Sequence, residues 1–250
     1  MVALPDQADL HQFYYTEFNL CDLRSPCGKI VIMKTYWIIG GGHFGRRAAH
    51  LIRRKEANSE IIIIDKQSSI CKQLDHSGFK TVCTEGIRYL ETNLIAQDHP
   101  DWIIPSIPVH VAYEWIKSKL TSQYNVKPVP IPHQLKANLP NPFQAESDQL
   151  YVSNADFICP ENCSEPDELC TYTGRPRPRS LNEFLNNFRY RDFRSVIVFS
   201  QQLFPGVGGY TPKALHNALT EIESLPDRIL LGTACRCHGV LDAFKLSPVS

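Results

Sequence analysis

The sequence predicts an α/β protein in which a parallel sheet is followed by a second α/β portion with a cysteine-rich loop. Two observations carry this prediction. Residues 35–66 hold two short apolar runs on either side of a segment with helical periodicity, which is the order of a parallel βαβ unit. Residues 180–231 again alternate between helix-like and strand-like segments, and cysteines stand on both sides of them.

The opening βαβ unit is predicted element by element. Residues 36–39, Tyr-Trp-Ile-Ile, form a short apolar run that is typical of a buried strand. The isoleucines at 61–64 form the second strand. The helix between them is expected to bury the residues that recur at helical spacing, which are Phe44, Ala48, Leu51 and Ile52. We expect solvation of the arginines on its other faces, which are Arg46, Arg47, Arg53 and Arg54.

Three glycines between the first strand and the helix have the G-x-G-x-x-G spacing of a Rossmann-like dinucleotide site. Gly40 allows a tight turn out of the strand, Gly42 allows the backbone to approach a diphosphate, and Gly45 allows close helix–sheet packing. The first turn of the helix supplies N–H groups and the positive end of the helix dipole to that diphosphate. The alternative is a glycine-rich turn that binds nothing.

Asp65 ends the second strand, about twenty residues after the last glycine, where an acidic residue holds a ribose 2′-hydroxyl. Its charge favours NAD over NADP, because it would repel a 2′-phosphate, although the adjacent Lys66 weakens that preference. The predicted cofactor-binding residues are therefore Gly40, Gly41, Gly42, His43, Phe44, Gly45, Asp65 and Lys66.

The glycine turn, Phe44, Ala49 and the Asp65-Lys66 pair resemble the nucleotide-binding module of the RCK/Trk-type potassium-transport regulators. The triple glycine also resembles, less closely, the dehydrogenase module of siroheme synthases. The likeness covers about a quarter of the chain and ends beyond Asp65. The regulators usually place Gly-Asp after the third strand, where this chain has Thr84-Glu85-Gly86. The resemblance therefore implies the cofactor site and neither family's activity.

The rest of the first domain continues the alternation. Strands are predicted at 80–83 and 101–104, and helices at 87–94 and 112–120. The prolines at 105 and 108 make a stiff loop at the carboxyl end of the fourth strand, which is the side where doubly wound sheets hold ligands. His110 follows this loop. It could contact a substrate or nicotinamide, or it could serve only as a cap or surface residue.

Length and spacing suggest four segments. We expect residues 1–32 to be a dispensable extension, so that a chain beginning at Met33 folds, as judged by circular dichroism. Residues 33–125 are predicted to form the Rossmann domain, and 151–250 the cysteine-containing α/β portion. Residues 126–150 are predicted to form a connection, because five prolines within 128–142 favour extended backbone.

Composition excludes some partners. Lys and Arg number 26, as do Asp and Glu, so no net field argues for nucleic acid or an anionic membrane. No apolar run approaches the roughly 20 residues of a membrane span. Nine cysteines without a recognisable export signal favour a reducing cytoplasm, where thiols stay free or bind metal. The sequence leaves homo-oligomerisation open.

Cysteines gather in two places in the second half. Three of them follow a C-x3-C-x6-C pattern in a polar stretch that does not resemble core, and two more stand beside a histidine near the far end. A tetrahedral zinc site or a [4Fe–4S] cluster needs four such ligands. We therefore predict a shared zinc or iron–sulfur site, against unrelated reduced cysteines or a redox pair. Its predicted ligands come from Cys159, Cys163, Cys170, Cys235, Cys237 and His238.

A strand–loop–helix lies between the two cysteine clusters. Ser180 opens a predicted helix through an S-x-x-E capping box. Strands are predicted at 195–199 and 229–231, with a helix beginning at Thr211-Pro212 between them. The glycines at 206–209 could cradle an anion or form a plain turn. In a parallel sheet this glycine loop and the Cys235–His238 cluster would emerge at the same edge.

Two functions follow from these features. The first is an NAD-dependent oxidoreductase with a Cys-ligated metal site and a small-molecule substrate, although the catalytic residues cannot be named. The second is a non-catalytic module that senses NAD(H) or redox state and reports it to a partner. A metal that serves only to hold a small second domain together is a third reading.

Overall fold

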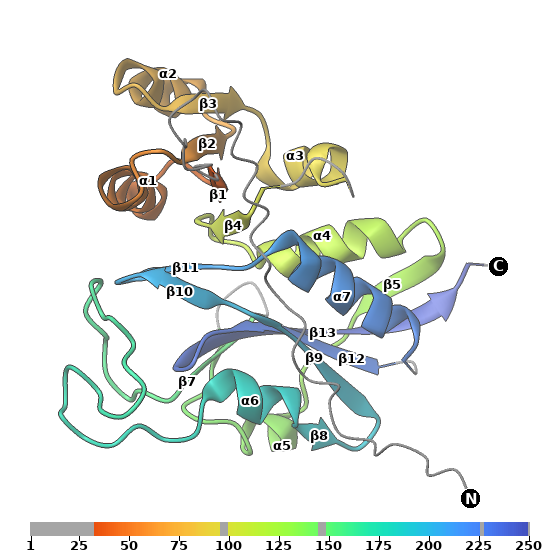
Figure 1. The fold of residues 1–250 in the computed structure, drawn as a ribbon. Coiled ribbons are helices and arrows are strands. Elements are labelled where there is room, and N and C mark those ends of the chain that lie inside the picture. The colour runs from red at the N-terminus through yellow and green to blue at the C-terminus, as the bar shows by residue number, and fades with distance from the viewer. Residues whose placement is uncertain (1–32, 96–99, 145–148, 226–227, 250) are drawn as a thin grey trace, which may run out of the picture. The chain divides into compact units, whose positions relative to one another are not determined.

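The computed structural model describes residues 33–95, 100–144, 149–225 and 228–249 (Figure 1). The predicted extension at residues 1–32 lies outside the described residues. Residues 33–250 form one compact unit. The predicted division of this unit at residues 125 and 150 stays a prediction, and strand β5 (Tyr124–Pro128) crosses the first of these boundaries.

The first sheet is parallel, in the order β3-β2-β1-β4. Its elements alternate strand and helix, and the four strands and α3 each begin within two residues of the predicted start. They are β1 (Thr35–Ile39), α1 (His43–Lys55), β2 (Glu60–Asp65), α2 (Ser68–His76), β3 (Lys80–Cys83), α3 (Gly86–Asn93) and β4 (Trp102–Pro105). The Rossmann-like parallel sheet is therefore confirmed.

Helix α4 (Val111–Leu120) joins the first sheet to the rest of the chain. Its sequence predicts one apolar stripe, yet six of its ten residues are buried. The physical reason is that α4 packs against α3 on one side and against strands of the second sheet on the other. Trp115 and Ile116 have no exposed surface.

The second sheet is mixed rather than parallel. Its order is β6-β7-β13-β12-β9-β8, and β5 pairs with the far half of β13. Among its described strands, β9 and β12 are the one parallel pair. Three residues join β12 to β13, and so short a connection forces these two strands to pair antiparallel. The strands are β5, β6 (Phe143–Gln144), β7 (Leu150–Ser153), β8 (Arg189–Tyr190), β9 (Phe193–Phe199), β12 (Arg228–Ala234) and β13 (His238–Pro248).

The proline-rich segment is more regular than its sequence suggests. Residues 124–128 form β5, and α5 (His133–Lys136) follows a short extended stretch. Pro128 is compatible with β5 because it ends the strand, and β5 pairs only with β13.

Between β9 and helix α7 (Pro212–Glu223) the chain forms a hairpin of β10 (Gln201–Phe204) and β11 (Val207–Gly209). The glycines there serve a turn, and the amide of Gly206 donates to the carbonyl of Cys163. Thr211 caps α7 with Pro212 at its first position, as predicted. Helix α6 (Leu181–Asn186) also begins as predicted, but the capping box does not form because the Ser180 hydroxyl bonds the Asn182 side chain instead.

The helices cover both sheets. Helices α4 and α7 lie on the face of the second sheet that turns toward the first, and α5 and α6 lie on its other face (Figure 1). One apolar core therefore runs from Trp37 and Ile39 of β1 through α4 to Leu231 and Phe244 of the second sheet. A separate core lies between the first sheet, α1 and α2.

Gly45 should tolerate no side chain. A Cβ added there would lie 1.8 Å from the carbonyl oxygen of Gly40, whereas a Cβ at Gly42 would meet nothing within 4 Å. Gly45→Ala should therefore lower the free energy of unfolding by at least about 2 kcal/mol. The control Gly42→Ala should change it by less than about 0.5 kcal/mol. Urea denaturation measures both, and equal stabilities would contradict the contact.

Candidate functional site

The glycine turn lies at the carboxyl end of β1. Gly40 has a φ of +109°, which only glycine adopts readily, and its amide donates to the Ile64 carbonyl at 2.7 Å. Gly42 is the N-cap residue of α1, so the first amides of the helix follow the turn directly. This is the arrangement in which a Rossmann-like turn receives a diphosphate.

Asp65 lies beside this turn at the end of β2. Its Oδ2 accepts a hydrogen bond from the Gly41 amide at 2.7 Å, and its Oδ1 accepts one from the Gln67 amide at 2.8 Å. Carboxylate oxygens have further acceptor capacity, so a sugar hydroxyl can bond the same group. The structure therefore brings together the glycines and the carboxylate that the sequence predicts. Lys66 is exposed beside them.

His43 and Phe44 lie at the outer side of the turn. Both are exposed, and their rings meet edge to face with centroids 5.1 Å apart. His43 Nε2 lies 3.4 Å from Glu161 Oε2, which connects the start of α1 with the cysteine-bearing loop. Phe44 was expected in the buried stripe of α1, but the helix begins at His43 and leaves its second residue outside the core.

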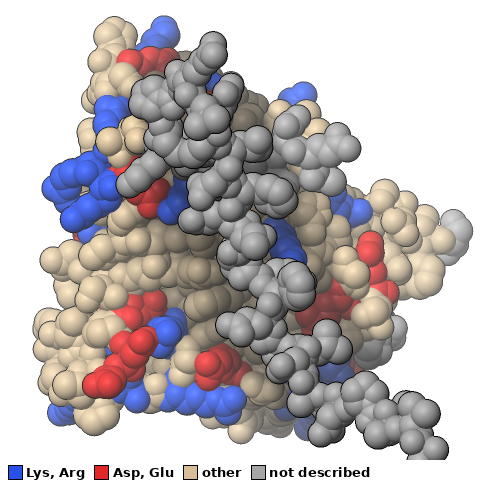
Figure 2. All heavy atoms as spheres, in the orientation of Figure 1, with Lys and Arg blue, Asp and Glu red and all other residues tan. Residues whose placement is uncertain are grey.

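The arginines of α1 were expected to be solvated, and Arg54 is exposed as expected, but the other three contact neighbouring residues. Arg46 Nε donates to the Gly41 carbonyl at 2.9 Å, so its positive charge lies at the glycine turn. Arg47 donates to the carbonyls of Pro205 and Gly206, and Arg53 stacks on the Phe79 ring at 3.3 Å. Figure 2 shows Lys and Arg side chains gathered over the place that α1 occupies in Figure 1. Arg46 contacts the glycine turn, and sequence reasoning did not single it out; its position one turn into the helix is the signal that could have found this contact.

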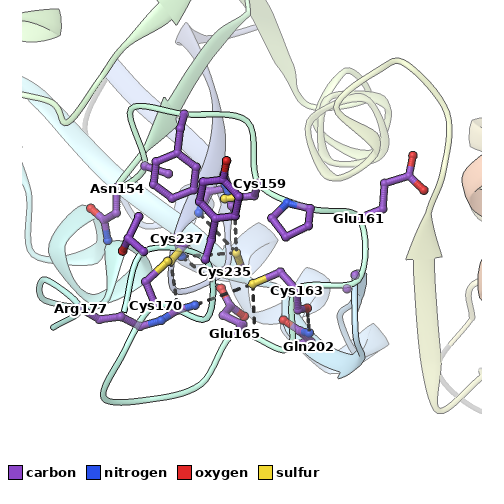
Figure 3. A pocket seen from close by; sticks show the side chains of 18 of the residues that line it. Asn154, Cys159, Glu161, Cys163, Glu165, Cys170, Arg177, Gln202, Cys235 and Cys237 are labelled. Carbon is purple, nitrogen blue, oxygen red and sulfur yellow. Dashed lines mark hydrogen bonds between the residues drawn. The ribbon is translucent and has the colours of Figure 1, made fainter. Parts of the chain in front are cut away.

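The two cysteine clusters line one cavity of about 510 Å³ (Figure 3). One cluster comes from the loop between β7 and α6, and the other from the turn between β12 and β13. They share an edge because β7 ends at Ser153, which pairs with His238 at the start of β13. The glycine loop after β9 emerges at the same edge, as the sequence predicted, because Phe199 lies beside Ala234 of β12 in parallel register. The cavity also reaches Phe44. Its thiols, all free, are those of Cys159, Cys163, Cys170, Cys235 and Cys237.

Several sulfur atoms accept hydrogen bonds. Cys235 Sγ accepts from the amides of Cys237 at 3.4 Å and His238 at 3.3 Å, and Cys163 Sγ accepts from the Glu165 amide at 3.4 Å. Arg177 Nη1 donates to Cys237 Sγ at 2.7 Å. Amide and guanidinium donors of this kind stabilise negative charge on sulfur.

Burial opposes that charge. It raises the pKa of Cys235 to about 12, with a further contribution from Glu165. Burial also raises the pKa of Cys237 to about 11, although Arg177 opposes this rise. Hydrogen bonds at Thr173 lower the pKa of Cys170. Burial lowers the pKa of His238 and so favours its neutral form.

The metal expectation receives no support from this geometry. Within residues 33–95, 100–144, 149–225 and 228–249, no three His, Cys, Asp or Glu side chains are arranged to hold a metal ion. The thiols share a cavity without converging on one point, and Arg177 lies against two of them.

No described helix is both long and apolar enough to cross a membrane.

His110 is the N-cap residue of α4, although its side chain makes no capping hydrogen bond, and it is not a surface residue. It is buried, with 3% of its surface exposed, where α4 begins. Its Nδ1 lies 2.7 Å from Asp242 Oδ2 and its Nε2 lies 2.8 Å from Thr233 Oγ1. The sequence could not predict that His110 contacts Asp242 and Thr233, because no local pattern links residues so far apart in the chain.

The fold and the glycine turn together define a dinucleotide-binding type of α/β protein. Residues 36–103 match the TrkA-N domain, which confirms the resemblance to the Trk-type regulators. Residues 112–247 match the family model described as "Uncharacterized protein, C-terminal domain", and the chain belongs to that family.

A relative from Archaeoglobus fulgidus, described as "Uncharacterized protein", is 29% identical over 219 residues. The match covers 83% of this chain and 98% of the relative. No solved structure matches the chain.

The cysteines should differ in their reaction with iodoacetamide, because the thiolate is the form that reacts. At about pH 8, Cys170 should be alkylated first, since its pKa is lowered, and Cys235 last, since burial raises its pKa to about 12. Peptide mass spectrometry after timed exposure measures the order. Equal rates at Cys170 and Cys235 would contradict the environments described above.

Proposed function

We propose that the protein binds NAD(H) at the glycine turn and acts as an NAD-dependent oxidoreductase. The observation that carries this proposal is the contact between the Asp65 carboxylate and the Gly41 amide, directly before the N-terminus of α1. One group suited to a sugar and one suited to a diphosphate are thereby placed side by side. The TrkA-N match supports the same site.

The cofactor preference follows from charge. The Asp65 carboxylate would repel the 2′-phosphate of NADP, while it accepts hydrogen bonds from the ribose hydroxyls of NAD. Arg46 contacts the turn itself, so its charge acts on the diphosphate rather than on a 2′-phosphate. NADH is therefore the dinucleotide we expect to bind more tightly.

Asp65→Ala should weaken NADH binding by roughly 10- to 100-fold, because a hydrogen bond to a charged group contributes about 1.5–3 kcal/mol. Isothermal titration calorimetry with NADH and NADPH measures this, and the preference for NADH should shrink. The matched control is Glu60→Ala at the opposite end of β2, where the side chain pairs with the exposed Lys80. Absence of heat with both dinucleotides in the unaltered protein would refute the proposed function.

A second candidate is a non-catalytic module that senses NAD(H) or redox state. The specific observation in its favour is the TrkA-N match, because residues 36–103 resemble a module of regulators rather than of enzymes. Measurement of NADH oxidation with a panel of carbonyl compounds separates the two candidates. Tight binding without turnover would favour the sensor.

We also propose that the cysteine cavity takes up a soft metal, as zinc or an iron–sulfur cluster. The support is chemical: five free thiols line one cavity, and two of its sulfurs already accept amide hydrogen bonds. Binding would require the side chains to converge and Arg177 to leave Cys237 Sγ. A bound metal would supply either a Lewis acid or a structural link between the two loops.

Cys163→Ala and Cys237→Ala should each abolish metal retention, since the two residues come from different loops of the cavity. Metal analysis and a visible spectrum after anaerobic purification measure this. Cys83→Ala is the control, because Cys83 is exposed at the end of β3 and does not line the cavity. Unaltered protein that holds neither zinc nor iron would refute the metal proposal and leave the dinucleotide proposal intact.

A further inference from the structure

A second cavity, of about 210 Å³, lies where β4 passes into α4. Pro105, Ile107 and His110 line it from that connection, and Thr233 and Val240 line it from the second sheet. Tyr210 completes it from the residue after β11. It is smaller than the roughly 300–1,000 Å³ of most ligand pockets, so only a small molecule would fit.

Two polar side chains that line this cavity, those of His110 and Thr233, form a connected chain with Asp242, which does not line it. Asp242 Oδ2 lies 2.7 Å from His110 Nδ1, and His110 Nε2 lies 2.8 Å from Thr233 Oγ1. A carboxylate accepts hydrogen bonds and does not donate them, so Nδ1 carries a proton and donates it to Asp242. Nε2 then faces the Thr233 hydroxyl, and a proton can pass between the ring and that hydroxyl.

The fold holds this chain rigidly. Thr233 and Asp242 project from neighbouring strands β12 and β13, on the face of the second sheet that packs against α4. His110 immediately precedes α4 and stacks on Tyr113, with ring centroids 6.3 Å apart. Its side chain is only 2% exposed and that of Asp242 14%. A pair this buried and this well connected keeps its geometry when a ligand binds.

Tyr210 lines the cavity and leaves one polar atom unsatisfied within the described part of the chain. The residue is 1% exposed, and its hydroxyl has no hydrogen-bond partner among the residues that the structure describes. A buried hydroxyl without a partner costs roughly 1–3 kcal/mol, so such groups are uncommon unless something else satisfies them. Burial raises the pKa of Tyr210 far above its ordinary value, so the hydroxyl stays protonated and remains a donor.

The cavity also lies on the side of the turn where the second half of a dinucleotide is expected. Asp65, at the end of β2, defines the adenosine side, and β4 lies on the opposite side of β1. Ile107 connects the turn with the cavity: a Cβ added at Gly40 would lie 2.6 Å from Ile107 Cγ2, and Ile107 lines the cavity.

We infer that this cavity is the substrate site of the proposed NAD-dependent oxidoreductase and takes a small, uncharged aldehyde or ketone, or the matching alcohol. The inference rests on the proposed function. No Lys or Arg side chain lines the cavity among the described residues, and most of its lining is apolar. A carboxylate would therefore lose its hydration without gaining a Lys or Arg partner, and the only histidine of the described lining already pairs with the Asp242 carboxylate.

The roles of the side chains follow from their positions. Bound NADH supplies the hydride, which carries two electrons to the carbonyl carbon. The Tyr210 hydroxyl has no partner among the described residues, and a side-chain rotation toward the ligand would let it donate a hydrogen bond to the carbonyl oxygen. Thr233 gives its proton to that oxygen and regains one from His110 Nε2, while Asp242 stabilises the charged ring. Solvent then returns a proton to His110, so carbonyl, NADH and one proton become alcohol and NAD⁺.

The test begins with binding rather than turnover. Isobutyramide, an uncharged amide whose carbonyl NADH does not reduce, serves as the probe in calorimetry on the protein saturated with NADH. It should bind, and Tyr210→Phe should weaken it about tenfold, which corresponds to about 1.4 kcal/mol. Tyr190→Phe on β8 is the control and should leave binding within about twofold. Propanal and acetone should oxidise NADH, and pyruvate should be a much poorer substrate.

Stability gives a second measurement that needs no ligand. Tyr210→Phe removes only an unsatisfied hydroxyl, so the free protein should melt at the same temperature or higher. His110→Gln should lower turnover and flatten its pH profile more than it changes KM, whereas a purely structural histidine would change stability alone.

Three outcomes would overturn the inference. If NADH binds but isobutyramide does not and no carbonyl is reduced, the cavity is not a substrate site and the dinucleotide proposal stands. If pyruvate is preferred, the substrate class is wrong. If NADH itself fails to bind, both the proposed function and this inference fall.

Discussion

The close contact between Gly45 of α1 and Gly40 of the preceding turn is the constraint on which the rest of the structure depends. Any side chain at Gly45 would overlap the Gly40 carbonyl, so the helix can approach the turn this closely only because residue 45 is glycine. This approach directs the N-terminus of α1 along the edge of the sheet. It also fixes the distance from the helix to Asp65, whose carboxylate bonds the turn.

Helix α4 connects the first sheet with the second half of the chain. Helix α4 follows β4 in the chain and packs against α3 as well as β12 and β5, so it fixes the second sheet relative to β4. His110 stands at its start and bonds Asp242 and Thr233, which come from strands more than a hundred residues later. The two halves of the chain thus share a core and a set of polar contacts.

Much of the first sheet could be predicted because local signals agree: apolar runs of strand length, a glycine pattern with a mechanical reason, and helical periodicity. The second sheet was harder. Residues 235–237 form the turn that lets β13 pair antiparallel with β12. Because two of these three residues are cysteines beside a histidine, the sequence was interpreted as a metal site and the turn was not predicted. Likewise, a single histidine gives no periodic signal, and its partners are brought to it only by tertiary packing. Phe44 was misplaced because one apolar residue at the start of a helix looks like part of its buried stripe.

The continuous core has a consequence for how the chain can be divided. Sequence similarity separates residues 36–103 from residues 112–247, yet Trp37, Ile39 and Ile64 share one apolar cluster with Leu231 and Phe244. Residues 36–103, although they match a domain of their own, are therefore not expected to be soluble without the rest of the chain. Expressed alone, this segment would expose an apolar face of its sheet to water. It would then self-associate or bind chaperones unless another protein covered that face.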